Sequence, residues 1–282
     1  MAITPLAAGN KRKRTAAMGK TGNAEKVVTG WRGWLADMAA ATALLTILPV
    51  PMRWQNGADW PRAMRALPLV GLGVGTVAAV VAWLALLAGA TNALAALLAV
   101  LAGVGVSGAL HEDGLADMAD ALGGASRRKR LEILRDVHAG TFAILALVFA
   151  VALQAAALGA LLRHGPGHAL AALVAAHMLS RNAMVIMARR LLPARKEGMG
   201  HGVAQPDATA SMIAAPVVFF LLLFAFEPLA ALLAMFLAIG VAEGGMEWLA
   251  RKYFGGQTGD ILGATEVVVR TTTLLALAML AP

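Results

Sequence analysis

The strongest chemical signal in this sequence is a group of acidic residues between positions 111 and 120. Asp113, Asp117 and Asp120 stand at i, i+4 and i+7, so on a helix their carboxylates share one face. Like charges placed in this way repel, and a nearby cation would offset the repulsion. Mg²⁺ suits such ligands, because it takes one or two carboxylates and fills its other positions with water and substrate phosphate. The spacing therefore predicts a metal–phosphate site; the alternative is a solvated acidic face paired with the basic run 127–130.

Basic residues that could hold phosphate follow in two further segments. Ser126 as an N-cap predicts a short helix over 127–137, in which Arg135 is the candidate anion ligand. Arg181 lies inside an apolar stretch, where a charge usually faces a site or a buried partner. Arg195 lies in the basic loop after that stretch and is a candidate clamp for a diphosphate. The same loop charges would also serve as a topology signal, and the sequence leaves both interpretations open.

A glycine-rich segment, 255–264, precedes the last apolar stretch. It places Gly256, Thr258, Gly259 and Asp260 at a predicted helix start, where backbone N–H groups bind anions. Asp260 could complete a metal site there. The alternative interpretation is a flexible connector.

The composition limits the elements that can position these residues. Of 282 residues, 59% are hydrophobic and 14% are charged, and the mean hydropathy is +0.72. Soluble chains are about 45–50% apolar and about 25% charged, so the excess apolar surface needs lipid around it. The absence of cysteine excludes disulfides, thiolate catalysis, zinc–thiolate sites and iron–sulfur clusters.

The apolar stretches predict an all-α, polytopic membrane helical bundle. A membrane-spanning helix needs about 20 apolar residues, which allows about seven spans. The stretch 34–50 is short and contains Asp37, so it is expected to be an interfacial or re-entrant helix. The predicted spans are 67–90, 92–110, 141–162, 168–188, 209–226, 229–246 and 267–281.

The charge distribution predicts the orientation. The net charge is +8, and loops on the cytoplasmic side carry the excess Lys and Arg. This explains the basic balance better than nucleic-acid binding does, so no nucleic-acid partner is expected. Residues 1–30 are interpreted as a basic disordered cytoplasmic tail that touches lipid headgroups, and 31–282 as a single transmembrane catalytic domain. The loops expected to be cytoplasmic are 53–65, 111–140, 189–208 and 247–264.

Taken together, these segments resemble the cobalamin synthase family, the adenosylcobinamide-GDP ribazoletransferases. The resemblance covers about 34–281. Two positions depart from the family pattern: Arg270, where an acidic residue is usual, and Glu112, where an apolar one is frequent. The matching motifs are Leu44-Leu45-Thr46-x-Leu48-Pro49-Val50-Pro51, His111-x-Asp113-Gly114-Leu115-Ala116-Asp117-x-x-Asp120-Ala121-Leu122-Gly123-Gly124, Arg135-Asp136 with Gly140-Thr141-Phe142, Ser180-Arg181, Pro193-Ala194-Arg195-x-Glu197-Gly198-Met199-Gly200 and Gly256-x-Thr258-Gly259-Asp260-x-Leu262-Gly263-Ala264.

The resemblance implies a Mg²⁺-dependent, multi-pass transferase of the bacterial inner membrane. A ribose hydroxyl of α-ribazole, or of its 5′-phosphate, attacks adenosylcobinamide-GDP; GMP leaves, and adenosylcobalamin or its 5′-phosphate forms. The three spaced aspartates would hold Mg²⁺, Arg181 and Arg195 would steady the leaving GMP, and Asp260 would be a second metal ligand or the base. Homo-oligomers and contacts with other corrin-pathway enzymes are left open.

Two other classes share some of these features. Membrane transferases for CDP-alcohols or prenyl diphosphates also hold Mg²⁺ with spaced aspartates, but the CDP-alcohol type expects an Arg after the Asp-Gly pair that this sequence lacks. A transporter would want charges in mid-span on several helices. The sequence instead gathers most of its motif charges at predicted helix ends.

Overall fold

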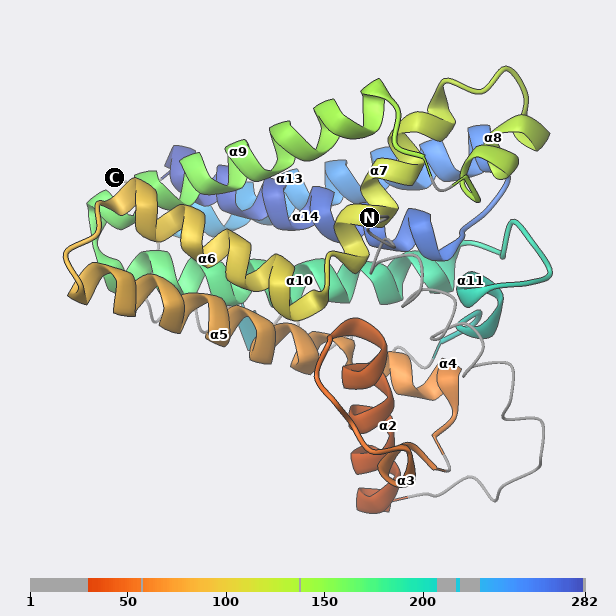
Figure 1. Cartoon of the computed structure of the whole chain (residues 1–282), viewed down its shortest axis with the longest axis horizontal. Coiled ribbons are helices and arrows are strands. Elements are labelled where there is room, and N and C mark those ends of the chain that lie inside the picture. Colours follow the sequence, from red (N-terminus) through yellow and green to blue (C-terminus); the bar gives the residue numbers. More distant parts are fainter. Residues whose placement is uncertain (1–29, 57, 137, 207–216, 219–228, 281–282) are drawn as a thin grey trace, which may run out of the picture.

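The computed structural model describes residues 30–56, 58–136, 138–206, 217–218 and 229–280, and this part of the chain consists of helices joined by short loops, with no β-strand (Figure 1). The predicted all-α class is therefore confirmed. The helices are α2 (Gly30–Leu45), α3 (Met52–Gln55), α4 (Trp60–Ala63), the 3₁₀ turn η1 (Met64–Ala66), α5 (Leu67–Leu87), α6 (Asn92–Ser107), α7 (Leu110–Leu122), α8 (Arg127–Ile133), α9 (Thr141–His164), α10 (Pro166–Arg190), α11 (Met199–Gly202), α13 (Leu229–Leu249), the π turn η2 (Ala250–Phe254) and α14 (Gly259–Leu280).

Among the described residues, five helical segments are long and apolar enough to cross a membrane. A sixth candidate is the pair α6 and α7, which is bent by 91°. The predicted span 209–226 lies almost wholly outside the described residues, so the number of spans stays a prediction. The five segments are Trp60–Leu87, Thr141–His164, Pro166–Arg190, Leu229–Phe254 and Gly259–Leu280.

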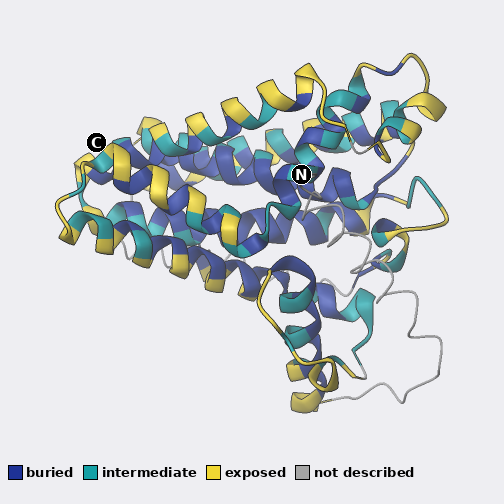
Figure 2. Ribbon diagram, in the orientation of Figure 1, coloured by how far each residue is buried: buried dark blue, intermediate teal, exposed yellow. Residues whose placement is uncertain are grey.

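Helices α10 and α14 form the centre of the bundle. Their most apolar windows are 78% and 72% buried, whereas those of the other three single spans are between 28% and 39% buried. Figure 2 shows this contrast as dark central helices and exposed outer faces on α5, α6 and α9. In a bilayer those outer faces would meet lipid, since no other described part of the chain covers their apolar side chains.

Small residues allow the central helices to approach closely. A methyl group added at Gly75 of α5 would lie 2.9 Å from the Cα atom of Val174 on α10, and one at Gly103 of α6 would lie 3.0 Å from the His177 ring. Because a side chain at either position would collide, the glycines set the spacing of α5, α6 and α10, as is typical of membrane helix pairs.

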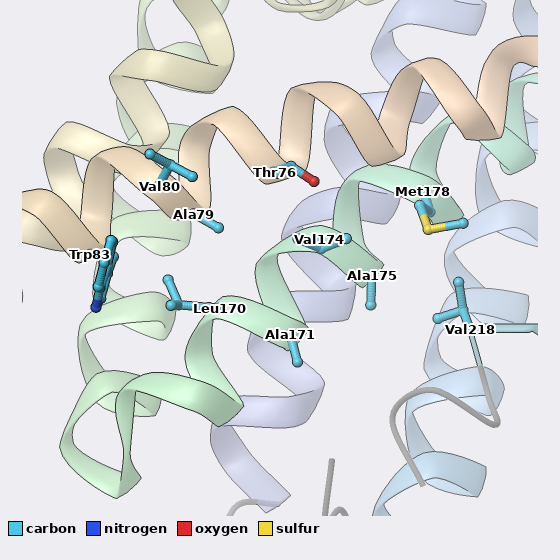
Figure 3. Close-up of a pocket in the computed structure, with 10 residues that line it drawn as sticks. All are labelled: Thr76, Ala79, Val80, Trp83, Leu170, Ala171, Val174, Ala175, Met178 and Val218. Carbon is cyan, nitrogen blue, oxygen red and sulfur yellow. The ribbon is translucent and has the colours of Figure 1, made fainter. Parts of the chain in front are cut away.

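An apolar cavity of about 420 Å³ lies between α5 and α10 (Figure 3). Its walls are side chains such as Ala79, Trp83 and Leu170, with Val218 on a third side. The hydroxyl of Thr76 donates to the Leu72 carbonyl of its own helix, 2.7 Å away. The described residues that line the cavity therefore offer no charged group to a phosphate ligand, and they do not fit the chemistry that the sequence predicts.

Helix α2 lies outside the bundle and across its long direction (Figure 1). Its 16 residues are fewer than a span requires, and it is not among the candidate spans. The carboxylate of Asp37, fully buried, accepts bonds from Arg62 at 2.9 and 3.0 Å and lies 2.8 Å from Arg65. Asp37 therefore ties α2 to the start of the first span, and the arrangement agrees with the predicted non-crossing helix.

The motif-bearing segments gather at one end of the bundle. Figure 1 shows α8, α11 and the beginning of α14 at its right end, with α4 on the same side, whereas the α5–α6 and α9–α10 connections lie at the left end. The loops that the charge pattern assigned to one side of the membrane thus share one end of the described structure. The predicted tail 1–30 falls on residues outside the description, apart from Gly30.

Candidate functional site

A sharp turn delivers the acidic segment to this end of the bundle. Helix α6 ends at Gly108, whose φ of 61° is left-handed, and Ala109 continues the turn with a φ of 53°. Glycine adopts this conformation without a Cβ penalty. The chain then bends by 91° into α7, and the predicted aspartates lie on this helix.

Helix α7 packs directly on the first turn of α14. A methyl group added at Gly114 would lie 2.6 Å from the Asp260 carbonyl oxygen and 3.2 Å from the Asp260 Cα atom. At Gly263, an added methyl group would lie 3.3 Å from the Cα atom of His111. The absence of side chains at both positions brings the backbone next to Asp113 against the backbone of Asp260.

The two predicted phosphate loops are held together by backbone hydrogen bonds. The amide of Gln257 donates to the Leu192 carbonyl at 2.9 Å, and the amide of Ala194 donates to the Gln257 carbonyl at 2.8 Å. Gly256 makes this contact feasible, since its φ of 150° is unfavourable for other residues and an added methyl group would lie 3.0 Å from the Ala194 nitrogen. The loop that carries Arg195 is thereby placed beside α14.

The start of α14 explains the Thr-Gly-Asp pattern locally. The Thr258 hydroxyl oxygen accepts from the amide of Ile261 at 3.3 Å and so caps the helix. It also donates to Asp260 Oδ2 at 3.4 Å. Thr258 and Asp260 are buried and Gly259 is half-buried. The helix begins eight positions before the predicted span 267–281, because this cap extends the apolar helix into the motif.

Arg195 joins the two loops electrostatically. Its Nη2 atom lies 3.2 Å from Asp260 Oδ2. Burial lowers the pKa of the Arg195 guanidinium from its ordinary value, the charge of Asp260 opposes that shift, and Arg135 and Asp117 act more weakly in opposite directions. An arginine keeps its positive charge at neutral pH. Four charged groups predicted from separate motifs thus lie within electrostatic reach of one another.

A basic cavity of about 520 Å³ opens beside this cluster. Arg135 and Arg195, both predicted to bind substrate, share its wall with two residues of the basic run, Arg127 and Arg128. The predicted short helix is present as α8, with the Ser126 hydroxyl accepting from the Lys129 amide at 3.2 Å, although it ends at Ile133. Several guanidinium groups around one cavity provide the donors that a diphosphate would need.

Asp120 has a structural role that its spacing did not predict. Its carboxylate oxygens accept from the amides of Gly140 and Ala143, at 2.5 and 2.9 Å. These amides belong to the first turn of α9, which has no earlier helical carbonyl to bind. Asp120 therefore connects α7 to the start of α9.

The donor set at this end fits Mg²⁺ only together with a phosphate ligand. In the ranges that the structure describes, no three His, Asp or Glu residues lie close enough to hold a metal ion. The predicted metal role of Asp113, Asp117 and Asp120, with water and substrate phosphate as the other ligands, stays a prediction. Mg²⁺ needs only one or two carboxylates when substrate phosphate completes its shell, and Asp113 and Asp117 on half-buried positions of α7 remain suited to that role.

Arg181 lies inside the predicted apolar helix and has a buried partner. Its side chain is fully buried within α10, and its Nη1 atom donates to Glu266 Oε1 on α14 at 2.8 Å. A contact with a leaving nucleotide would require Arg181 to release this carboxylate. The alternative that the sequence offered, a buried partner, describes its position.

Sequence reasoning missed the rest of this buried cluster. Glu266 and Arg270 lie on α14, and Glu112 precedes Asp113 on α7. Arg270 is hydrogen-bonded to Glu112, so the two positions that depart from the family pattern contact each other. The available signal was a charge inside an apolar helix, which by itself indicates a buried partner.

Comparisons with known proteins agree with the motif pattern. The model of the family described as cobalamin-5-phosphate synthase matches residues 37–278. A Rhizobium etli protein named adenosylcobinamide-GDP ribazoletransferase is 40% identical over 254 residues, which are 88% of this chain and 98% of that protein. Proteins of the same name from Azorhizobium caulinodans and Rhizobium meliloti are 39% and 38% identical, over 86% of this chain and 94% and 96% of theirs.

No solved structure shows a significant match to this chain. The family match begins within α2, ends within α14 and covers every predicted site residue. With relatives of about 40% identity along nearly their whole length, the chain belongs to the cobalamin-5-phosphate synthase family.

Proposed function

We propose that this protein is an adenosylcobinamide-GDP ribazoletransferase. It joins α-ribazole, or α-ribazole 5′-phosphate, to adenosylcobinamide-GDP and releases GMP, which completes the nucleotide loop of cobalamin. The family membership and the names of the relatives support this activity. The observation that carries it in the structure is the basic cavity in which Arg135 and Arg195 meet, beside Asp260.

The reaction requires one bond to form and one to break at a phosphorus atom. The ribose hydroxyl oxygen attacks the phosphorus on the cobinamide side of the diphosphate. The bond to the bridging oxygen breaks, and GMP leaves with the electron pair. In phosphoryl transfer the protein mainly positions the groups and neutralises developing charge. Arg195 and Arg135 supply positive charge where the leaving phosphate would lie.

The carboxylates at this end have two proposed roles. Asp113 and Asp117 would hold Mg²⁺ on the substrate diphosphate, and the ion would neutralise charge there when bound. Asp260 is the candidate acceptor for the ribose proton. Its contact with Arg195 keeps the carboxylate at the cavity edge. The loop that places Asp260 is shaped by Gly256, Thr258 and Gly259. Their backbone would lie next to the bound phosphate.

We also place the protein in the bacterial inner membrane, with the cavity facing the cytoplasm. The five candidate spans support a multi-pass arrangement. The basic loops gather at one end of the bundle, which is the cytoplasmic end by the positive-inside rule. Guanine nucleotides are present on that side.

A purified-protein assay tests this function. The protein in detergent or lipid nanodiscs would receive adenosylcobinamide-GDP, with α-ribazole and Mg²⁺ supplied together or singly, and GMP would be measured. GMP release that needs both additions supports the proposal. Release of CMP from a CDP-alcohol substrate, or ion flux in liposomes without GMP release, would instead assign the protein to another transferase class or to transport.

A further inference from the structure

Four charged side chains of alternating sign are buried in the middle of the described bundle. They are Arg181 on α10, Glu266 and Arg270 on α14, and Glu112 on α7. Arg181 and Glu266 are fully buried, and Arg270 and Glu112 are 2% and 6% exposed. The proposed chemistry at the cavity uses none of them, although such residues are costly inside a membrane protein.

The four residues form a continuous chain of contacts. Glu266 Oε1 accepts from Arg181 Nη1 and from the Ser180 hydroxyl, each at 2.8 Å. Glu266 Oε2 lies 3.6 Å from Arg270 Nη2, and the same nitrogen donates to Glu112 Oε1. The order Arg181, Glu266, Arg270, Glu112 thus alternates positive and negative charge and links three helices. We call this set the ion chain.

The ion chain holds α7 in a defined position against α14. Its two arginines and two glutamates balance, so the four side chains together add no net charge to the interior. A charge left without its partner at low dielectric is strongly unfavourable. The contact between Glu112 and Arg270 therefore favours the one position of α7 in which both charges are paired. Within the ion chain, Arg270 links Glu112 of α7 to Glu266 of α14.

The end of the ion chain lies next to the proposed site. Glu112 directly precedes Asp113 in α7, and Asp117 follows one turn later. At Gly114, α7 touches the backbone of Asp260. A rotation or slide of α7 on α14 would therefore move Asp113 and Asp117 relative to Asp260, although Glu112 itself is turned into the protein.

We propose that Glu112 and Arg270 are positioning residues, which fix α7 on α14 and so hold Asp113 and Asp117 in register with Asp260. This inference rests on the proposed function, because the register matters through the carboxylates that would hold Mg²⁺. It predicts that the contact between Glu112 and Arg270 affects Mg²⁺ binding through the position of α7, in addition to any effect on stability.

The test compares four variants of the full-length protein in nanodiscs. R270M and E112M each leave the ion chain with one excess charge, negative in R270M and positive in E112M, whereas E112M/R270M removes both charges and keeps the interior neutral. L277A truncates a fully buried apolar side chain on the same helix and serves as the control for lost stability alone. The measurements are the melting temperature, the Mg²⁺ concentration for half-maximal GMP release, and hydrogen exchange of the α7 amides.

If Glu112 and Arg270 position α7, the double variant should recover its melting temperature but not its response to Mg²⁺. Its melting temperature should return to near the wild-type value, because a buried ion pair can be replaced by apolar side chains at little cost. Its half-saturating Mg²⁺ concentration should still be raised at least fivefold, since α7 has lost its directional bond. L277A should lower the melting temperature without changing that concentration. A double variant that recovers both values overturns the proposal.

Two further measurements keep the proposal testable if R270M or E112M does not fold, or if the wild type needs no Mg²⁺. E112Q keeps the Oε1 acceptor for Arg270, so its half-saturating Mg²⁺ concentration should stay within threefold of wild type; a rise as large as that of E112M/R270M contradicts the role. If Mg²⁺ proves unnecessary, the proposed metal role fails. Hydrogen exchange of the α7 amides then tests whether the ion chain holds α7 in place. Faster exchange of α7 amides in E112M/R270M than in L277A supports the link, and equal exchange rejects it.

Discussion

At the scale of single residues, three regularly spaced aspartates have different surroundings. Asp113, Asp117 and Asp120 share a helical pattern, yet both oxygens of Asp120 are engaged by the first amides of α9. Asp117 instead belongs to the charge cluster around Arg195. Identical side chains in a regular pattern thus differ because different neighbours face them.

Substitution of Asp117 by Asn should lower turnover at least about a hundredfold, as loss of a preorganised charge at a phosphoryl-transfer site does. The protein should still insert and melt normally, because the isosteric side chain preserves packing. GMP release by purified protein measures the effect, with Glu247→Gln, which removes a half-buried carboxylate of α13 outside the proposed site, as the control. Turnover within a factor of two of wild type would refute a metal role for Asp117.

Substitution of Asp120 should act mainly on stability. Asp120→Ala leaves two amides of α9 without their acceptor, which should cost about 1–3 kcal/mol of unfolding free energy. Asp120→Asn keeps one acceptor oxygen and should cost less. Thermal unfolding with and without Mg²⁺ checks this. If Asp120→Asn lost Mg²⁺-dependent activity as completely as Asp117→Asn while keeping its melting temperature, Asp120 would be a metal ligand instead.

At the scale of elements, glycines decide how closely the helices of the site approach. Gly114 faces Asp260 across the α7–α14 contact, and Gly256 lets the Arg195 loop pair with the segment before α14. Both glycines stand in motifs, and the structure shows that close backbone contact is a sufficient reason for their small size. The motif spacing indicated a site there without indicating this packing.

Substitution of Gly114 by Ala should push α7 away from α14, because the new methyl group would lie 2.6 Å from the Asp260 carbonyl oxygen. We expect a loss of about 1–3 kcal/mol in stability together with reduced GMP release. Gly73→Ala on α5 is the control, since no atom lies within 4 Å of its added methyl group. It should be neutral or slightly stabilising. Equal melting temperatures for the two variants would contradict the close contact.

At the scale of the whole molecule, charge and architecture agree on orientation. The end of the bundle with α8 and α11 carries the basic cavity, and the connection between α5 and α6, residues 88–91, has no charged residue. By the positive-inside rule, this distribution supports the proposal that the cavity faces the cytoplasm. A transporter built on buried charges would need them along an open pathway, whereas the ion chain is buried and internally paired.

Cysteine labelling can test this orientation cleanly, because the chain has no cysteine of its own. Ala88→Cys and Ala125→Cys are matched exposed substitutions at opposite ends of the bundle. A membrane-impermeant maleimide should label Ala88→Cys in spheroplasts and label Ala125→Cys only after lysis. The reverse pattern would place the cavity outside the cytoplasm and would remove its access to cytoplasmic guanine nucleotides.

The sequence by itself determined the all-α class with apolar helices long enough to span a membrane, and it singled out Arg135 and Arg195, which the structure brings to one cavity. Apolar length, charge placement and helical spacing are local properties that can be read along the chain. It could not show that Asp120 supports α9, that Arg181 is paired within the bundle, or that Glu112 meets Arg270. These outcomes depend on which helices pack together and at what angle, and that is decided by contacts between residues up to 158 positions apart.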